Sequence, residues 1–379
     1  MNKEIKNLLL FCAVYPLFVF GQKDKKIMFS VVNPALIERK QELVGIAWKD
    51  IVSKYPSIDT ADFKVINALT KKEIPFQLEY RGQANIQNLL LPIDAAANSI
   101  SDFYLQEGKP AIINSKTYCR YVPERKDDFA WENDKIAFRM YGQALESTNE
   151  NAYGMDVWVK RTDRLVINER YKRGEYHVDH GDGMDYYHVG FSLGAGNIAP
   201  YVNDSIYYSK NYHQWKVLDN GPLRSAFQLV YDEWDVAGKA VKVIKTISLD
   251  AGSQLSRVEV NYSYANGDSL PVVVGIIKRK EPGIILQDEQ NGIMGYWEPQ
   301  HGIDGITGTG TIFLKPVVKM KVTNEHLLAQ LTARKEESFI YYTGAAWNKA
   351  GLITNAQTWF SYLQLFQQLL QQPLQVKLM

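Results

Sequence analysis

The expected fold rests on Ala240-Val-Lys-Val-Ile-Lys-Thr-Ile-Ser-Leu249 and on Leu255-Ser-Arg-Val-Glu-Val-Asn-Tyr-Ser-Tyr264. Both stretches alternate apolar and polar side chains, which is typical of a strand with one buried face. Between them, Asp250-Ala-Gly-Ser253 is a good hairpin connection. Similar runs occur along the chain, separated by the Asn, Asp, Gly and Pro residues that turns require. We therefore predict an all-β protein, a large antiparallel β-sandwich of two broad sheets packed face to face.

The chain has 379 residues, and its segments differ in character. We predict one large β-sandwich domain over residues 22–379, with an N-terminal strand layer at 22–110 and the main site-bearing sheets at 111–350. A C-terminal helix is expected over residues 354–372, because apolar side chains recur there at steps of three and four and Pro373 stops the pattern.

The first residues have the order of a secretory signal peptide. Lys3 and Lys6 precede an apolar run from Leu8 to Phe20, and cleavage is expected after Gly21. The run is too short for a comfortable membrane span, so we expect no membrane insertion. The protein is therefore predicted to be secreted, to the periplasm or the cell surface.

Composition excludes some function classes. Lys plus Arg number 43 and Asp plus Glu 42, so the basic excess of a nucleic-acid binder is missing and no nucleic-acid partner is expected. Only Cys119 remains after cleavage, which rules out an intrachain disulfide. The 23 Tyr, 15 Phe and 8 Trp suit carbohydrate, because such rings offer flat apolar faces and some carry polar tips. An all-β protein is also rich in these residues for packing reasons.

A first dense polar patch lies at residues 116–134. It contains Arg120, Arg125, Asp127 and Asp128 with aromatic residues between them. Arginine can hold a carboxylate through two parallel hydrogen bonds, and carboxyl groups can serve as acid and base. The alternative is a salt-bridged surface loop.

A second patch, at residues 175–188, holds three of the six histidines: His177, His180 and His188. Histidine changes its proton state near neutral pH, so this loop suits proton transfer. A metal site made by His177, Asp179 and His180 is an alternative, but strand alternation would turn His180 to the other face. We therefore expect no protein-bound metal and no cofactor, with a divalent cation left open.

Two further patches could present stacking rings and polar neighbours. They contribute Asn211, Tyr212 and Trp215 from residues 207–215, and Trp297, Glu298 and His301 from residues 296–301. The alternative for residues 207–215 is an edge strand with one solvated face.

Six runs, in this order, resemble a family of secreted bacterial proteins catalogued as domain of unknown function 4861. They are Tyr121-Val-Pro-Glu-Arg-Lys-Asp-Asp-Phe-Ala-Trp-Glu-Asn-Asp134, Asp156-Val-Trp-Val-Lys-Arg-Thr-Asp-Arg-Leu-Val166, Tyr176-His-Val-Asp-His-Gly-Asp-Gly183, Asn211-Tyr-His-Gln-Trp-Lys-Val-Leu218, Tyr296-Trp-Glu-Pro299 and Tyr342-Thr-Gly-Ala-Ala-Trp347. The resemblance implies a galactose-mutarotase-like supersandwich and a place in polysaccharide utilisation. It also implies uronate- and rhamnose-containing glycans as targets. At least one branch of the family looks like an oligosaccharide dehydratase, related in chemistry to polysaccharide lyases.

The residues can support β-elimination from a uronic-acid-containing oligosaccharide, as a dehydratase or a lyase. Positive charge must stabilise the enolate-like intermediate, a base must take the C5 proton and an acid must protonate the oxygen leaving C4. Our hypothesis gives the first role to Arg120 or Arg125, the second to His180 or else His177, and the third to Tyr212 or Tyr187. The residues expected to bind substrate are Arg125, Asp127, Asp128, Asn211, Trp215, Trp297, Glu298 and His301.

Two other functions stay open. A glycoside hydrolase would use two carboxyl groups drawn from Glu124, Asp127, Asp128, Asp179, Asp182 and Glu298. A non-catalytic glycan-binding protein would bind sugar without forming product.

Overall fold

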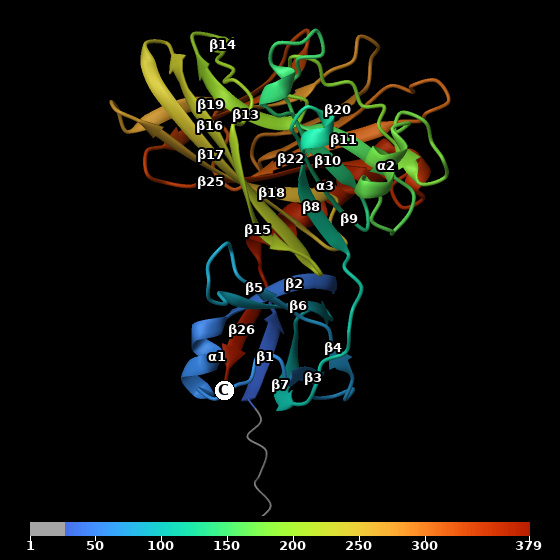
Figure 1. The fold of residues 1–379 in the computed structure, drawn as a ribbon, viewed down its shortest axis with the longest axis vertical. Helices are drawn as coiled ribbons and strands as arrows, with labels where there is room; N and C mark the ends of the chain where they lie inside the picture. The colour runs from blue at the N-terminus through green and yellow to red at the C-terminus, as the bar shows by residue number, and fades with distance from the viewer. Residues whose placement is uncertain (1–26) are drawn as a thin grey trace, which may run out of the picture.

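A computed structural model describes residues 27–379, which form two bodies stacked along the long axis of the molecule (Figure 1). The larger body is built from the middle and C-terminal parts of the chain. The smaller body holds the N-terminal strands and the last strand of the chain. The predicted signal peptide at residues 1–21 lies outside the described residues.

The larger body is an antiparallel β-sandwich, as predicted. Its broad sheet has the order β15 (Gln214–Asn220), β16 (Arg224–Val236), β17 (Lys239–Asp250), β18 (Leu255–Tyr264), β25 (Phe339–Trp347), β22 (Thr307–Phe313), β21 (Ile293–Trp297) and β20 (Ile284–Asp288). The facing sheet has the order β14 (Ser205–Ile206), β13 (Ala195–Val202), β19 (Ser269–Ile277), β24 (His326–Arg334) and β23 (Lys319–Val322). The predicted hairpin is present as β17 and β18, with Ile247 opposite Val258. Both side chains are buried in the main core, as the alternation predicts.

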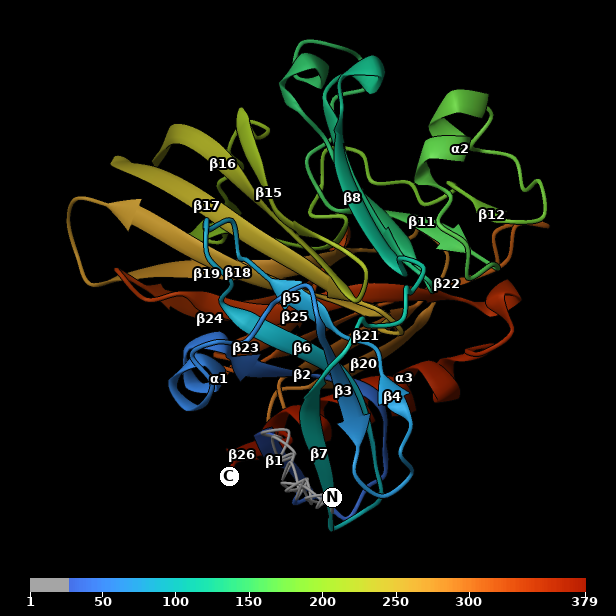
Figure 2. The same cartoon turned by 60° about the horizontal axis from the view of Figure 1, so that its bottom comes forward.

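A third sheet packs over the broad one. Its order is β12 (Gly183–Met184), β11 (Asp156–Lys160), β10 (Ala137–Met140), β9 (Asp128–Asn133) and β8 (Thr117–Val122). Strand β8 contacts β15 and β16, whereas β11 contacts β25, so the two ends of this sheet lie over different parts of the broad sheet (Figure 2). The short helix α2 (Ile167–Arg173) follows β11. The first polar patch therefore lies mostly in two strands, and every residue of β9 is buried.

The predicted C-terminal helix is α3 (Ala356–Gln371). Asn355 caps it by accepting a hydrogen bond of 3.0 Å from the backbone N–H of Thr358. Its apolar face packs on β21 and β22, where Trp359 and Leu363 are fully buried. A Cβ at Gly310 would lie 2.6 Å from Leu363 Cδ1, so this glycine permits the close approach of the helix. In the described part of the chain, no helix is both long and apolar enough to cross a membrane.

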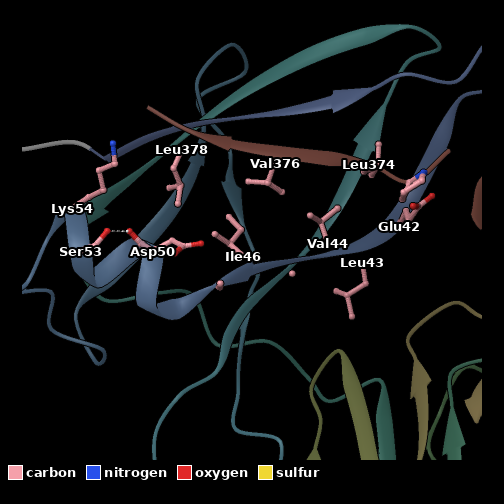
Figure 3. A pocket seen from close by; sticks show the side chains of 13 residues that line it. Glu42, Leu43, Val44, Ile46, Asp50, Ser53, Lys54, Leu374, Val376 and Leu378 are labelled. Carbon is pink, nitrogen blue, oxygen red and sulfur yellow. Dashed lines mark hydrogen bonds between the residues drawn. The ribbon is translucent and has the colours of Figure 1, made fainter. Parts of the chain in front are cut away.

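The smaller body is a second pair of antiparallel sheets with its own hydrophobic core. One has the order β26 (Gln375–Leu378), β1 (Ile27–Asn33), β7 (Ser99–Glu107), β3 (Phe63–Asn67) and β4 (Glu73–Ile74). The other has the order β2 (Arg39–Ala47), β6 (Asn88–Ala95) and β5 (Gln77–Glu79), and α1 (Trp48–Lys54) follows β2. A groove of about 710 Å³ runs between β2 and β26, lined by apolar side chains such as Val44, Ile46 and Val376 (Figure 3).

Buried polar contacts join the two bodies. The guanidinium of Arg39, on β2, donates hydrogen bonds to the carbonyls of Leu369 and Gln372 at the end of α3. Asp219 of β15 accepts hydrogen bonds of 2.7 Å from the backbone N–H groups of Tyr80 and Arg81. The N-terminal layer thus has its own core, and hydrogen bonds hold it against the sandwich. The division into one domain over residues 22–379 stays a prediction.

Candidate functional site

The structure brings Tyr187, Arg279 and Glu298 together near one edge of the sandwich. Arg279 follows β19 and Glu298 follows β21, and the Arg279 Nε atom lies 2.7 Å from Glu298 Oε1. The same guanidinium covers the ring of Tyr187, with its carbon 4.6 Å from the ring centroid. Its Nη1 donates a 2.6 Å hydrogen bond to the carbonyl of His188, which fixes the group against the loop after β12. We call Tyr186, Tyr187, Arg279, Glu298 and His301 the tyrosine–arginine site.

Glu298 is poised to exchange a proton near neutral pH. Its side chain is buried, and this burial raises its pKa to about 7 although Arg279 favours the charged form. Burial also holds the pKa of Tyr187 well above its usual range, with the Glu298 charge adding to the effect. Within residues 27–379 the Tyr187 hydroxyl is buried and has no hydrogen-bond partner. A buried polar group of this kind is available to a ligand.

Tyr186 and His301 form the outer side of the site. The Tyr186 hydroxyl accepts a 2.7 Å hydrogen bond from Thr307 Oγ1, and its ring centroid is 5.5 Å from that of His301. Burial raises the pKa of Tyr186, and the charges of Glu298 and Asp304 raise it further. Asp304 Oδ2 lies 3.0 Å from His301 Nδ1, which leaves the other ring nitrogen to act on a ligand.

A cation–aromatic contact lies beside the site, where the ring centroid of Trp347 is 6.4 Å from that of Tyr186. The guanidinium carbon of Arg161 lies 4.8 Å from the ring centroid of the buried Trp347, and Arg161 is also paired with Asp179. Trp347 donates a 2.9 Å hydrogen bond to the carbonyl of Asp304. Asp179 also accepts hydrogen bonds from the backbone of the Gly-containing loop that carries His180. Arg161 therefore contacts both Asp179, in this loop, and Trp347, beside the site.

A buried cluster of one arginine and three carboxyl groups lies on β9, β10, β11 and the loop after β12. Arg139 contacts Asp156 at 2.6 Å, Asp185 at 3.1 Å and Asp128 at 3.3 Å. We call these four residues the Arg139 cluster. Burial raises the pKa of Asp128 to about 6 and holds that of Asp185 well above its usual range. Three carboxyl groups with one guanidinium favour a shared proton, because the like charges repel at short range.

His177 connects this cluster to solvent. Its side chain is 66% exposed, yet Nδ1 lies 2.8 Å from the carbonyl of Asp185 and 3.7 Å from its carboxylate. The charge of Asp156 in the same cluster also raises the pKa of Tyr187. The charge of the Arg139 cluster is therefore felt at Tyr187, in the tyrosine–arginine site.

The structure places Arg120, Arg125, Asp127, Asn211, Tyr212 and Trp215 elsewhere, around the end of β8 and the start of β15. Arg120 is paired with Glu124. The guanidinium of Arg125 donates a 2.9 Å hydrogen bond to the hydroxyl of Tyr176. These arginines thus already have partners in the protein.

Three predicted residues are buried in packing or in hydrogen bonds within the protein. Tyr212 is buried, and its hydroxyl donates to the carbonyl of Asp127, while burial raises its pKa strongly. Trp297 is buried in the apolar cluster beneath α3, and a Cβ at Gly308 would lie 2.6 Å from its ring. Its face is therefore not open to a sugar. Asn211 is buried too, and its side chain donates a 3.2 Å hydrogen bond to the carbonyl of Gly142.

The predicted residues thus divide into groups. Tyr187, Glu298 and His301 share the tyrosine–arginine site, and His177 and Asp128 belong to or contact the Arg139 cluster. His180 Nε2 lies 3.5 Å from Glu175 in the exposed loop. The sequence analysis missed Arg279 and Arg139. Arg279 follows the apolar run at residues 271–277 directly, inside Lys278-Arg279-Lys280, and charge at the end of a buried strand is a signal that could have indicated it.

Within residues 27–379, no group of three or more His, Cys, Asp or Glu side chains is arranged to hold a metal ion. Whether a cation takes part stays a prediction.

The chain is similar to several known proteins. A family model described as domain of unknown function DUF4861 matches residues 31–376. An uncharacterized protein, P7, from Formosa agariphila is 32% identical over 396 residues, covering 98% of each chain. Among solved structures, an alpha-mannosidase from Enterococcus faecalis V583 has a TM-score of 0.52 at 10% identity, over 93% of this chain and 46% of that one. A glycosyl hydrolase family 38 protein from Enterococcus faecalis has a TM-score of 0.53 at 9% identity, over 93% and 47%. This chain therefore spans about half the length of those two structures, and the likeness is one of fold.

Proposed function

This chain belongs to the DUF4861 family, and on that premise we propose that it is a carbohydrate-active enzyme that works at the tyrosine–arginine site. The observation that carries the proposal is the contact of the half-buried Arg279 with the buried Glu298, beside the Tyr187 hydroxyl, which has no hydrogen-bond partner within residues 27–379. Perturbed acids in contact with a fixed cation are typical of catalytic sites. The fold similarity to solved carbohydrate-active enzymes supports a sugar as the substrate.

The finer proposal is elimination from a sugar acid. When Glu298 holds its proton, Arg279 loses its counterion and can pair with the carboxylate of a substrate instead. That pairing stabilises the negative charge that develops when the C5 proton is removed. Arg279 thus supplies the positive charge that a divalent cation would otherwise provide.

The protons are assigned to two residues. His301, oriented by Asp304, takes the proton from C5, and the electron pair of that bond forms the C4–C5 double bond. The C4–O bond breaks as Glu298 gives its proton to the leaving oxygen. Tyr186, beside His301, and Tyr187, beside Arg279, can donate hydrogen bonds to the sugar. The roles expected from sequence for Arg120, His180 and Tyr212 are replaced in this proposal.

The test is incubation with a panel of uronate oligosaccharides. Elimination creates a double bond conjugated to the carboxylate, so ultraviolet absorbance rises. Loss of one water from an intact oligosaccharide identifies a dehydratase, and shortened unsaturated products identify a lyase. A panel that yields neither absorbance nor a change of mass contradicts elimination.

Glycoside hydrolysis is the second candidate. It is favoured by the raised pKa of Glu298, because hydrolysis also needs a carboxyl group that is protonated near neutral pH. It predicts new reducing ends without ultraviolet absorbance. A non-catalytic glycan-binding protein would bind these sugars and form no product. For the exported enzyme, the proposed compartment is the periplasm or the cell surface.

A further inference from the structure

A pair of stacked rings, one half-buried and one exposed, lies away from the tyrosine–arginine site. Tyr121, on β8, and Trp215, on β15, have ring centroids 4.9 Å apart at an interplanar angle of 20°. Trp215 is 43% exposed, which is unusual for so large a side chain. Its ring centroid lies 6.0 Å from that of the buried Phe129. We call Tyr121 and Trp215 the aromatic platform. Such a flat, anchored and solvent-facing surface is suited to the apolar face of a sugar ring.

The loop beside the platform is held in a strained conformation. Lys126 and Asp127 have φ angles of 48° and 60°, in the left-handed region that residues other than glycine rarely adopt. The buried Tyr212 fixes this turn by donating its hydroxyl hydrogen to the Asp127 carbonyl. A Cβ at Gly142 would lie 1.9 Å from that carbonyl oxygen, so the neighbouring backbone also presses against it. Strain maintained in this way often marks a ligand site.

The strained turn places the carboxylate of Asp127 beside the hydroxyl of Tyr121, at the edge of the platform. The Tyr121 hydroxyl donates to the Asp127 carboxylate, and this bond raises the pKa of Tyr121 to about 12. The phenol thus stays protonated at neutral pH, and its ring is fixed parallel to that of Trp215. A carboxylate at the rim of an aromatic surface can accept hydrogen bonds from sugar hydroxyls.

The charges around the platform are paired within the protein. Arg120 pairs with Glu124, and Glu150 pairs with both Arg125 and Lys126. Arg120, Arg125 and Lys126 each face a carboxylate of the protein, and Asp127 adds a negative charge at the rim, so the platform offers mainly stacking and hydroxyl contacts. An uncharged pyranose fits this chemistry better than a uronate.

The platform is separate from the tyrosine–arginine site. Trp215 is on β15 at one edge of the broad sheet, and Glu298 follows β21, six strand steps away in the order of that sheet. At about 4.8 Å per step this is roughly 29 Å along the sheet. The buried Arg139 cluster lies on the strands of the covering sheet between the two ends.

We propose that Tyr121 and Trp215 form a second carbohydrate-binding surface, which stacks on uncharged pyranose rings of a polysaccharide. It deepens the proposed function, since the ligand is again carbohydrate, but it does not require the elimination reaction. Its role is to hold a polymer whose acidic units are processed elsewhere.

The test is affinity electrophoresis of the protein over residues 22–379 in gels that contain xylan, mannan or galactan. It uses a Glu298→Gln background, so that turnover does not consume the polymer. At least one neutral polymer is expected to retard this parent. Adding Trp215→Ala should weaken binding about tenfold or more, the loss expected for a well-packed aromatic anchor. Trp215→Phe should keep most of the retardation, and Gln214→Ala, one position along the strand on the other face, should keep all of it.

Three outcomes would overturn this inference. They are a parent that no neutral polymer retards, a Trp215→Ala variant that binds like its parent with an unchanged melting temperature, and Trp215-dependent binding confined to polyuronates and abolished by salt. The proposed function fails separately, if the wild-type protein turns over no carbohydrate at all while Trp215-dependent retardation persists.

Discussion

Arg279 Nε and Glu298 Oε1 lie 2.7 Å apart although the two residues follow different sheets of the sandwich, β19 and β21. An ion pair normally lowers the pKa of its carboxyl group, but here burial outweighs the arginine and raises it to about 7. The pair is therefore a cation and a proton donor held side by side, and the predictions on activity depend on that relationship.

Replacing Glu298 with Gln should lower turnover on the sugar substrate by about 10²–10⁴-fold, the range for loss of one general acid or base. The amide keeps the shape of the side chain but can neither give up nor take a proton at neutral pH. Initial rates measured by absorbance or by reducing ends check this expectation, and far-ultraviolet circular dichroism checks the fold.

The matched control is Glu281→Gln, at an exposed glutamate two residues after Arg279. It should leave the rate unchanged. A Glu298→Gln enzyme with wild-type turnover would remove Glu298 from the mechanism and would favour a glycan-binding protein.

The pH profile should fall on its alkaline side near pH 7. An acid with a pKa of about 7 is protonated below that value, so kcat/KM declines as pH rises through it. Arg279→Gln removes the positive charge that favours the ionised form, so the pKa of Glu298 rises and the alkaline limb moves to higher pH. The measurement is kcat/KM against pH for both enzymes. A limb that stays in place, or that moves to lower pH, contradicts the assignment even if Arg279→Gln is slow.

Local patterns predicted the strands but not the partners of the charges. Alternation in residues 240–264 located β17 and β18, because one buried face leaves a period of two in the sequence itself. Asp128 was predicted to bind substrate, and the alternative for the patch that holds Asp128 and Glu132 was a surface loop, because charge in a sequence suggests exposure. Both are fully buried. Arg139, on the adjacent strand β10, pairs with Asp128, and Lys160, one strand further on β11, lies 2.7 Å from Glu132.

The candidate site could be predicted only in part for the same reason, because local sequence does not show which side chains meet in the fold. Histidine clustering indicated the loop at residues 175–188, and Tyr187 does lie in the site. Arg279 carried a weaker local signal, charge at the end of a buried strand. Its role depends on tertiary contacts, because β19 and β21 end close to the loop after β12. Trp297 and Tyr212 were expected to face substrate. Sequence does not show that α3 covers the first and that Asp127 engages the second.

Arg139→Met should destabilise the fold by about 3–5 kcal/mol, the range for breaking a buried ion pair. The substitution leaves Asp128, Asp156 and Asp185 buried without a cation, so at least one must take up a proton or become solvated. Urea unfolding followed by tryptophan fluorescence measures the loss. The exposed Arg164→Met, expected to change stability by no more than about 0.5 kcal/mol, serves as the control. A loss for Arg139→Met no larger than that of the control would show that the cluster is neutral without its arginine.

Lys245 should make stability rise with pH between about 7 and 10. Its amine is buried inside the sandwich, where it donates a 2.6 Å hydrogen bond to Asn197 Oδ1 and lies 4.5 Å from the ring centroid of Tyr231. Burial lowers its pKa to about 7, against about 10.4 for a lysine in the unfolded chain. In this window the unfolded state therefore binds a proton that the folded state does not, and stability increases with pH by at most about 1.4 kcal/mol per unit. Below pH 7 both states hold the proton and the contribution becomes constant.

The measurement is the free energy of unfolding in urea at intervals from pH 7 to 9.5, for the wild type and for Lys245→Met. The upper limit keeps the tyrosines that face the amine, Tyr153 and Tyr231, protonated, because burial raises the pKa of both above 10. The difference between the two proteins isolates Lys245 from every other titrating group. It should shift steadily in favour of the wild type as pH rises, while Lys242→Met, at an exposed position of the same strand, should give a curve parallel to that of the wild type. Parallel curves for Lys245→Met as well would mean that the cation keeps its proton inside the ring of tyrosines, stabilised by their faces against the cost of burial.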